Sequence, residues 1–359
     1  MEDSTVDDSD ITKLETQVGS NWAAIRKARR DTVARQQELA SQFRDLTSSD
    51  AGLVVLGSLA RGELTSGSDL DWILLIDSQT FPEHKAQELV IERRLADADF
   101  IKPGKSGIFG RMVGSHALIH DIGGEDDLNS NTTRRILLLL EALPVGNREA
   151  YDRVRRQILK RYFLDDRGLT HGHSAIRIPR FLLNDLTRYW RTITVDFVYK
   201  QRADGDEKWG LRNAKLRFSR KLIFASGILA CFSCHLDSGA EKAQEALRVA
   251  KDVAPLTDYV ERLLERTPLE IVAKVCLEKE IAPEVVRQIF HSYDCFLALL
   301  DNPAKRQQLV EARDHSELRS SAAWKEVQAI SDPFHEGLVS LFFKSNEELS
   351  QLTMKYGVF

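Results

Sequence analysis

The sequence predicts an α+β domain built on a mixed sheet, followed by a mainly α-helical C-terminal domain. Two observations support this prediction. Short apolar runs at 53–56 and 70–76 are bounded by turn residues, which is typical of strands in a partly buried sheet. Beyond residue 148, nearly every segment instead places apolar residues at helical spacing.

The first part of the chain combines an acidic start with a helical pattern. Residues 1 to about 10 should be loose, and the segment 11–46 predicts one long helix or two ahead of the first strand. After the second strand, a helix is expected over 82–95. A third strand is expected over 99–102, where Pro103 and Gly104 stop it.

Glycine recurs between residues 104 and 124, which predicts an irregular segment facing the site. A helix over 132–142 should then end at the run 144–147, which we take as the domain boundary. The predicted domains are therefore an N-terminal tail and helix at 1–48, an α+β domain at 49–145 and a helical domain at 146–359. Within the last, helices are expected at 148–163, 179–202, 210–235, 239–251, 255–265, 283–300 and 335–353.

The composition predicts a soluble cytoplasmic protein. Lys and Arg number 50 against 54 Asp and Glu, so the chain as a whole is not a general nucleic-acid binder. Its acidic start is the opposite of a signal peptide, and no apolar run approaches the ~18 residues of a membrane span. Four scattered cysteines do not suggest a disulfide framework, and nothing indicates the oligomeric state.

Two carboxylates at the start of the second apolar run predict a metal site. Asp69 and Asp71 are two residues apart, so on a strand their side chains should share one face while Leu70 and Trp72 point into the core. Paired carboxylates suit Mg²⁺, with Mn²⁺ as an alternative, and magnesium completes its shell with water and substrate phosphates. A nucleoside triphosphate, with ATP favoured, supplies such phosphates.

Transfer at an α-phosphorus is helped by two Mg²⁺ ions, and such a pair commonly needs a third carboxylate. The sequence offers Asp97 and Asp99. We prefer Asp99 because it lies on the predicted third strand, whereas Asp97 falls at the junction of helix and strand. Asp99 would bind one metal and take the proton of the acceptor hydroxyl.

A turn before the carboxylates predicts the phosphate-binding element. Gly57 permits close approach of the backbone to a ligand, and Ser58 adds a hydroxyl where the chain should enter a helical turn through Arg61. We therefore expect Gly57, Ser58 and Arg61 to hold the triphosphate.

The Gly57-Ser58 pair, a ten-residue gap and Asp69-Leu70-Asp71 together resemble the DNA polymerase β nucleotidyltransferase superfamily. The segment 99–107 is further similar to the third-carboxylate segment of glutamine synthetase adenylyltransferases and signal-protein uridylyltransferases, although Lys102 stands where those have arginine. The resemblance covers about residues 50 to 145. It implies a Mg²⁺-dependent enzyme that moves an NMP from an NTP to an acceptor hydroxyl and releases pyrophosphate.

The helices expected over 177–221 carry a local excess of basic residues. The resemblance implies that the helical domain completes the nucleotide cleft, and Lys215 and Arg212 are our candidates for contact with the triphosphate. A solvated charged helix face explains the same pattern equally well. Binding of a nucleic-acid acceptor is a further interpretation.

The sequence does not decide which molecule carries the acceptor hydroxyl: a protein, a second nucleotide or an RNA end. With a nucleotide acceptor, the enzyme would make a cyclic or linear oligonucleotide signal of the bacterial defence type. An alternative of another class is a non-catalytic nucleotide-binding regulatory or interaction module, which would present the helical domain to a partner.

Overall fold

The computed structural model describes residues 9–46, 48–98, 107–172, 176–203, 208–312 and 319–357. Its four-stranded sheet has the order β3-β2-β1-β4. The strands are β1 (Ala51–Leu56), β2 (Asp71–Ile76), β3 (Arg111–Gly114) and β4 (Ala142–Val145). The sheet is mixed, because β1 pairs antiparallel with β2 and β4 while β3 runs parallel to β2.

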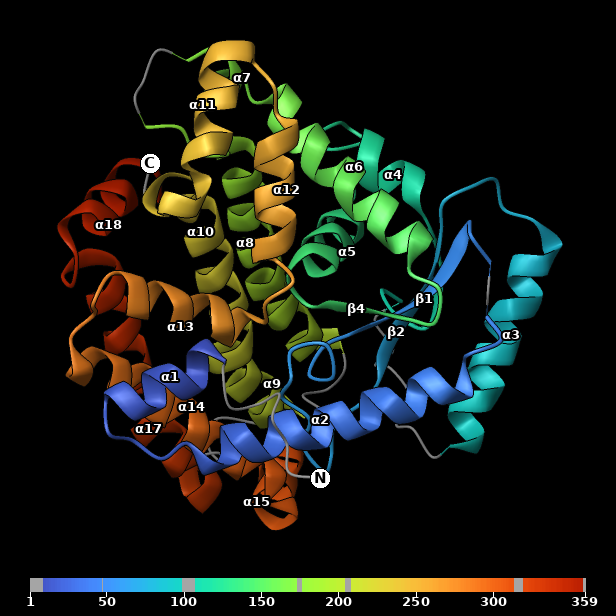
Figure 1. Ribbon diagram of the computed structural model, residues 1–359. Coiled ribbons are helices and arrows are strands. Elements are labelled where there is room, and N and C mark those ends of the chain that lie inside the picture. The colour runs from blue at the N-terminus through green and yellow to red at the C-terminus, as the bar shows by residue number, and fades with distance from the viewer. Residues whose placement is uncertain are drawn as a thin grey trace, which may run out of the picture.

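Helices flank the sheet and make up most of the remaining chain (Figure 1). Those before β4 are α1 (Asp10–Gln17), α2 (Ala23–Gln42), α3 (Pro82–Asp97), α4 (Ser115–His120) and α5 (Asn129–Leu140). Those after it are α6 (Glu149–Asp165), α7 (Arg167–Thr170), α8 (Arg180–Ala203), α9 (Trp209–Lys215), α10 (Lys221–Leu236), α11 (Glu241–Ala250), α12 (Ala254–Leu263), α13 (Pro268–Glu278), α14 (Pro283–Asp301), α15 (Pro303–Glu311), α17 (Ala322–Phe343) and α18 (Glu347–Leu352). The predicted architecture of a mixed sheet with a helical C-terminal part is confirmed.

Several individual elements also follow the sequence prediction. The strands expected at 53–56 and 70–76 are β1 and β2, and the helix expected at 82–95 is α3. The helical N-terminal segment is divided into α1 and α2. The strand expected at 99–102 lies outside the described residues.

The prediction of an irregular segment over 104–124 was wrong for the described part of that range, which contains β3 and α4. Of the four residues of β3 only Val113 is buried, so this edge strand has no apolar run to mark it. The segment 144–147 was likewise expected only to end the preceding helix. Instead, Ala142–Val145 forms a fourth strand, β4. Pro144 is tolerated there because β4 is an edge strand.

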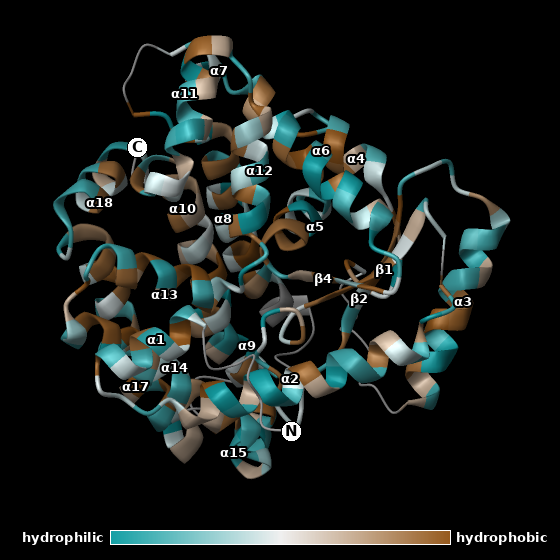
Figure 2. Cartoon of the chain, in the orientation of Figure 1, coloured by the Kyte–Doolittle hydropathy of each residue, from teal (hydrophilic) through white to brown (hydrophobic). Residues whose placement is uncertain are grey.

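The sheet is covered on both faces, which explains why β1 and β2 are almost entirely apolar. Alternate side chains enter two different cores. Leu53, Val55 and Trp72 pack with α2 and α3, whereas Val54 and Ile73 pack with α5 and α6. Figure 2 shows the strands as hydrophobic runs, while the outer helix α3 is mainly hydrophilic. Asp71 therefore lies on the face of the sheet that is turned toward the helical part.

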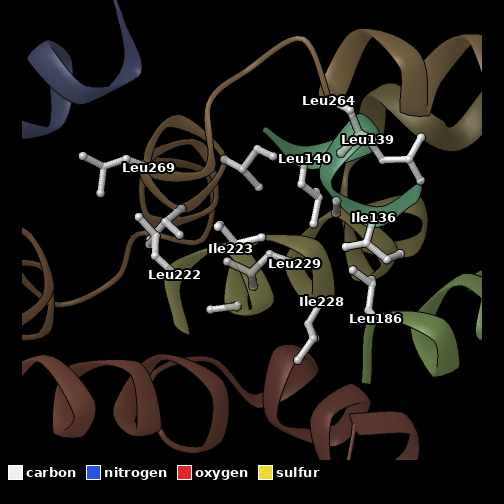
Figure 3. Packing of buried hydrophobic residues seen from close by; sticks show 14 of the residues in the cluster. Ile136, Leu139, Leu140, Leu186, Leu222, Ile223, Ile228, Leu229, Leu264 and Leu269 are labelled. Carbon is white, nitrogen blue, oxygen red and sulfur yellow. The ribbon is translucent and has the colours of Figure 1, made fainter. Parts of the chain in front are cut away.

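The helical part packs around α10, a helix that is buried along most of its length (Figure 3). Gly227 permits this packing, since a Cβ there would lie 2.7 Å from Leu186 Cδ2 and 3.0 Å from Leu140 Cδ1. Within the described residues, no single helix is long and apolar enough to cross a membrane. A bent pair, Trp209–Leu236 with Ser238–Ala250, meets that test on length and composition alone.

Helix α2 connects the sheet region to the helical part. Arg29 Nη2 lies 2.7 Å from Glu270 Oε1 on α13. On the other side, Gln36 donates to the Leu59 carbonyl at 2.9 Å and Thr32 Oγ1 accepts from the Leu64 backbone at 3.1 Å. The long connection between β1 and β2 is therefore anchored on α2.

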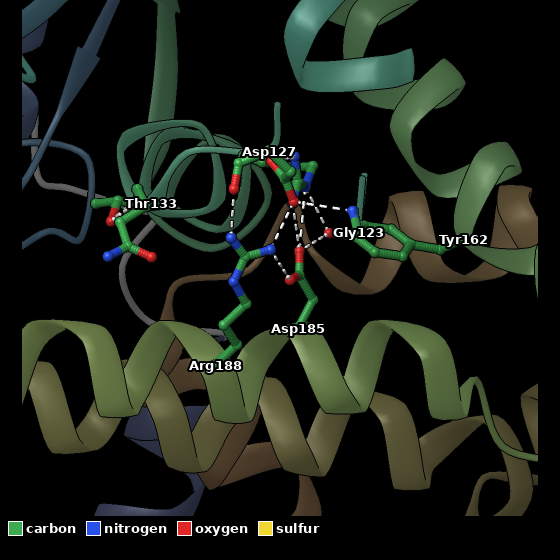
Figure 4. A network of polar contacts seen from close by, with 8 residues as sticks. Gly123, Asp127, Thr133, Tyr162, Asp185 and Arg188 are labelled. Carbon is green, nitrogen blue, oxygen red and sulfur yellow. Dashed lines mark hydrogen bonds and ion pairs between the residues drawn. The ribbon is translucent and has the colours of Figure 1, made fainter. Parts of the chain in front are cut away.

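A buried polar network joins α5, α6 and α8 (Figure 4). The fully buried Arg135 donates to Asp185 Oδ2 at 2.7 Å, to Asp127 Oδ2 at 2.9 Å and to the Tyr162 hydroxyl at 2.7 Å. Arg188 donates to the same Asp127 oxygen at 2.6 Å. The network thus holds α5 against α8 by charge as well as by apolar packing.

We expect Arg135→Ala to lower the free energy of unfolding by about 3–5 kcal/mol, because two buried carboxylates lose their shared cation. Denaturant titration measures the change. Arg148→Ala is the matched control, since Arg148 and Asp152 form an exposed pair whose loss should cost about 0–1 kcal/mol. Equal losses in the two variants would contradict the stabilising role of the network.

Candidate active site

The predicted phosphate turn and one predicted carboxylate lie side by side where β1 ends and β2 begins. Leu56 lies opposite Asp71 in the antiparallel register, so the turn that begins at Gly57 stands directly beside that carboxylate. Gly57 has φ +74°, a conformation that favours glycine. A Cβ at Gly57 would lie 3.2 Å from Asp71 Oδ2. Glycine is needed here for its backbone conformation and for the close approach.

The turn itself closes through backbone hydrogen bonds. Arg61 N donates to the Gly57 carbonyl at 3.1 Å, and Glu63 N donates to the Ser58 carbonyl at 2.8 Å. The chain forms a compact turn at 57–62, and the bond from Arg61 N to the Gly57 carbonyl has the spacing of the helical turn expected through Arg61. Ser58 lies at the beginning of this turn, one residue beyond the glycine that contacts Asp71.

Asp69 and Asp71 project from the same side of the chain. Leu70 and Trp72, which alternate with them, are buried in the opposite core, as predicted. Burial raises the pKa of Asp71 to about 7, and the negative charge of Asp69 adds to this. No described residue donates a hydrogen bond to the Asp71 carboxylate. The structure therefore holds a partly buried carboxylate beside a like charge.

Lys215 supplies the cation nearest to this pair. Its Nζ lies 3.5 Å from Asp69 Oδ1. Burial lowers the pKa of Lys215, while Asp69 acts in the opposite direction. For Asp69, burial raises the pKa, but Lys215, a backbone hydrogen bond and Arg306 together hold it below its ordinary value. One carboxylate of the pair is thus stabilised in its charged form, and the other is not.

A π-helical turn follows Lys215. Residues Leu216–Arg220 form this turn between α9 and α10. Such turns are frequent at functional sites. Phe218 of the same turn stacks on Phe296 with ring centroids 4.5 Å apart. The turn is therefore anchored in the core of the helical part.

Arg306 reaches the same site from α15. It donates to the Gly67 carbonyl in the connection between β1 and β2, two residues before Asp69. Burial lowers the pKa of Arg306, and Asp69 opposes this effect. Ser66 N donates to Asp301 Oδ1 at 3.0 Å, so the connection is also attached to the end of α14. Helices distant in sequence thus shape the loop that carries Asp69.

Arg61 is part of a buried cluster behind the phosphate turn. Its Nε lies 2.8 Å from Glu63 Oε2, and its Nη1 pairs with Glu141 at the end of α5. The Tyr293 hydroxyl on α14 donates to Glu63 Oε1 at 2.7 Å. Arg61 was predicted to hold the triphosphate, but its guanidinium is engaged in this cluster. Its position fits a supporting role for the turn.

The remaining predicted site residues have different outcomes. Arg212 lies on α9, one helical turn before Lys215 and on a similar face of the helix. Asp99 lies outside the described residues, so the structure does not place the predicted third carboxylate. Asp97 is the last residue of α3.

The basic excess over 177–221 is partly structural. Arg177 donates to the carbonyls of Leu169 and Gly172, and Arg217 donates to Asn213 Oδ1 at 3.0 Å. Arg188 belongs to the Arg135 network. Several of these charges therefore stabilise helix contacts.

Four residues near the carboxylates were not anticipated from the sequence: Glu63, Glu141, Tyr293 and Arg306. The pattern Asn302-Pro303 marks the start of α15, since Asn302 Oδ1 accepts from Lys305 N and proline occupies the first turn. That pattern could have predicted the helix that carries Arg306. Nothing local links Glu141 or Tyr293 to the site.

The donor set fits a magnesium ion that also binds substrate phosphates. Among the described residues, no group of three His, Cys, Asp or Glu side chains could hold a metal ion. Mg²⁺ commonly takes only one or two protein carboxylates and completes its octahedron with water and phosphate. The Asp71 carboxylate, which accepts no hydrogen bond from the described residues, is a suitable ligand.

Comparison with known proteins agrees with this geometry. Residues 37–107 match the family model of the nucleotidyltransferase domain. This chain contains a nucleotidyltransferase domain. The domain belongs to the polymerase β-like superfamily, which confirms the resemblance carried by Gly57, Ser58, Asp69 and Asp71. No curated protein matches the chain at a significant level.

The nucleotidyltransferase domain establishes the general chemistry as NMP transfer, with a nucleoside triphosphate as substrate. The matched segment contains the phosphate turn, both carboxylates and α3, and it extends through residues 99–106. It does not include α9 or α15, so the family match does not extend to Lys215 or Arg306.

We expect Gly57→Ala to lower NTP-dependent turnover, because the new methyl group would lie 3.2 Å from Asp71 Oδ2 and that carboxylate would have to shift by a few tenths of an ångström. Gly19→Ala is the matched control: Gly19 has φ +60° and no atom within 4 Å of the position that a methyl group would take, so it reports backbone strain alone. Both variants should lose about 1–2 kcal/mol of stability. Full activity in Gly57→Ala, measured as pyrophosphate release, would contradict the close approach.

Proposed function

We propose that the chain is a Mg²⁺-dependent nucleotidyltransferase that moves an NMP from an NTP, with ATP favoured, to an acceptor hydroxyl. One observation carries this proposal. Asp69 and Asp71 stand together beside the Gly57-Ser58 turn, and Lys215 Nζ lies 3.5 Å from Asp69. A carboxylate pair, a glycine-serine turn and a partly buried cation are groups that suit a metal-bound triphosphate.

Each group has a distinct task in the proposed reaction. Asp69 and Asp71 would hold Mg²⁺, which stabilises the charge that develops on the phosphate oxygens when it is bound. The backbone at Gly57 and Ser58 lies against the β and γ phosphates. Lys215 and Arg306 approach from the helical part and offset the negative charge of the triphosphate. Arg61 supports the turn through Glu63 and Glu141.

The chemical step is an in-line displacement. The acceptor oxygen forms a bond to the α-phosphorus, and the bond from that phosphorus to the bridging oxygen of pyrophosphate breaks. Pyrophosphate leaves with the electron pair, and the hydroxyl proton passes to a general base. Asp99 is our candidate for that base and for the third metal ligand, from its position in the sequence.

Electrostatics favours a cation site at the carboxylate pair. The Asp71 carboxylate gains no stabilising hydrogen bond from the described residues, and its neighbour Asp69 repels it. Such an arrangement costs folding stability and is typical of a site that is organised for a cation. A non-catalytic nucleotide-binding module would use the same pair, so pyrophosphate release is the measurement that separates the enzyme from it.

The substitutions Asp69→Asn and Asp71→Asn should each lower turnover to less than about one hundredth of that of the natural chain. Each removes a metal-ligating charge without changing the size of the side chain. Asp71→Asn should also be at least as stable as the natural chain without metal, since it removes the repulsion from Asp69. Pyrophosphate release and thermal unfolding measure the two effects.

For this experiment, Asp31→Asn is the control, because Asp31 forms an exposed pair with Lys27 on α2. It should leave turnover unchanged. Undiminished activity in Asp69→Asn or Asp71→Asn would overturn the proposed metal site.

Adding Mg²⁺ together with a non-hydrolysable NTP should raise the melting temperature, because the ligand binds only the folded site. At a ligand concentration ~100 times Kd the stabilisation is about 2.7 kcal/mol. Chelation of the metal should remove the effect, and Asp71→Asn should show a much smaller one. An equal rise in that variant would place the ligand elsewhere.

A further inference from the structure

Two arginines converge on one carbonyl oxygen at the β3 edge of the sheet. Arg111 is an exposed residue of β3, and Arg134 is a half-buried residue of α5. Arg111 Nη1 donates to the Gly107 carbonyl at 3.3 Å, and Arg134 Nη2 donates to the same oxygen at 3.0 Å. The two nitrogens therefore lie at most about 6 Å apart, the sum of these distances. We call Arg111 and Arg134 the edge arginines.

The edge arginines have no acidic partner among the described residues. Their side chains donate only to main-chain carbonyls, since the remaining bond runs from Arg134 Nε to the Ile108 carbonyl at 3.0 Å. Burial lowers the pKa of Arg134, and the positive charge of Arg111 lowers it further. Two like charges are thus held together without a counter-charge, an arrangement that a bound anion stabilises.

The space beside the edge arginines is open. Gly107 has φ +68°, and a Cβ there would meet none of the described residues beyond its chain neighbours within 4 Å. The bonds to carbonyls use one N–H group of Arg111 and two of Arg134, so the other N–H groups are available. Two guanidinium groups this close can both reach one phosphate, because charge-assisted N–H···O bonds are about 2.7–2.9 Å long.

Arg111 lies on the face of the sheet that carries Asp71. It is opposite Ile73 in the parallel pairing of β2 and β3, and Ile73 follows Asp71 by two residues. Side chains two residues apart on a strand share a face, and Val113 and Ile73 belong to the same core. With strands about 4.8 Å apart and a rise of about 3.3 Å per residue, the Cα atoms of Arg111 and Asp71 are about 8 Å apart.

The edge arginines and the phosphate turn lie on opposite sides of Asp71. In the strand order β3-β2-β1-β4, β2 with Asp71 stands between Arg111 on β3 and Gly57 at the end of β1. In the proposed function, pyrophosphate leaves on the side of the turn. An in-line displacement brings the acceptor oxygen from the opposite side of the α-phosphorus. The edge arginines therefore stand on the acceptor side of the carboxylates.

We propose that Arg111 and Arg134 form an anion-binding subsite that holds a terminal phosphate of the acceptor molecule. Two cations at one point match the nearly double negative charge of a phosphate monoester better than the single charge of a phosphodiester or a carboxylate. The inference rests on the proposed function for its transfer step. There, the acceptor's hydroxyl oxygen bonds to the α-phosphorus of the NTP, pyrophosphate leaves with the electron pair, and the proton goes to the general base. The terminal phosphate stays intact and only positions the acceptor.

Binding is tested apart from catalysis, by calorimetric titration of inorganic phosphate in EDTA without NTP, at constant ionic strength. Arg111→Gln and Arg134→Gln should each weaken phosphate binding about tenfold, because each removes a charged donor. Acetate, which carries a single charge, should bind more weakly than phosphate. Lys215→Gln should leave phosphate binding nearly unchanged, which separates the subsite from the phosphate turn.

Arg262→Gln is the matched control, because Arg262 is an exposed arginine on α12. It should bind phosphate like the natural chain. Arg111 is exposed, so Arg111→Gln should keep the thermal stability of the natural chain in chloride. Phosphate binding that is absent, or that both edge substitutions leave unchanged, would overturn the inference.

The acceptor class is tested with NTPs labelled at the α-phosphorus, Mg²⁺ and a small-molecule extract of cells. The natural chain should move label to a small molecule. Treating the extract with a phosphatase, which is removed before NTP is added, should abolish this transfer. Arg111→Gln should need about ten times more extract for half-maximal transfer, whereas Arg262→Gln should need the natural amount.

The two proposals fail in different ways. Phosphate binding that depends on the edge arginines, combined with no pyrophosphate release at saturating NTP and Mg²⁺ in the complete extract, would support the anion site and overturn the proposed function. Transfer of label that neither Arg111→Gln nor phosphatase treatment changes would support the proposed function and overturn the subsite. Transfer that both treatments abolish or weaken supports both.

Discussion

The rest of the site depends on the close approach of two like charges. Asp69 and Asp71 are held on one side of a strand end, with Gly57 backed against the second carboxylate. No described donor stabilises Asp71. The two apolar cores that clamp β1 and β2 from both faces supply the rigidity that keeps this unfavourable pair together. In the proposed function, a bound cation would relieve the repulsion between the two carboxylates.

The helical part is an integral part of the site. Lys215 comes from α9, Arg306 from α15 and Tyr293 from α14, and each reaches the segment between β1 and β2. The buried cluster of Arg61, Glu63, Glu141 and Tyr293 connects the phosphate turn to both α5 and α14. A shift of these helices would therefore move the turn.

The arginines of α8 and its neighbours belong to the excess of basic residues over 177–221, but they do not all have the same surroundings. Arg177 and Arg188 satisfy buried or partly buried acceptors, and they stabilise the helical packing. Arg191, on an adjacent turn of the same helix as Arg188, is exposed and has no side-chain partner among the described residues. The local excess of positive charge thus divides between helix packing and the protein surface, and only the surroundings of each guanidinium separate the two.

The sequence by itself determined β1, β2 and α3, because these elements follow from short-range periodicity of apolar residues. It also determined the phosphate turn and the two carboxylates, which depend on a glycine and two aspartates at fixed positions. It did not reveal β3 or β4, which are short edge strands with few buried residues. Lys215 was a candidate from the basic excess and the family resemblance, and only the fold placed it 3.5 Å from Asp69. Glu141, Tyr293 and Arg306 are separated from that carboxylate by more than seventy residues. Their approach depends on helix packing, which no local pattern encodes.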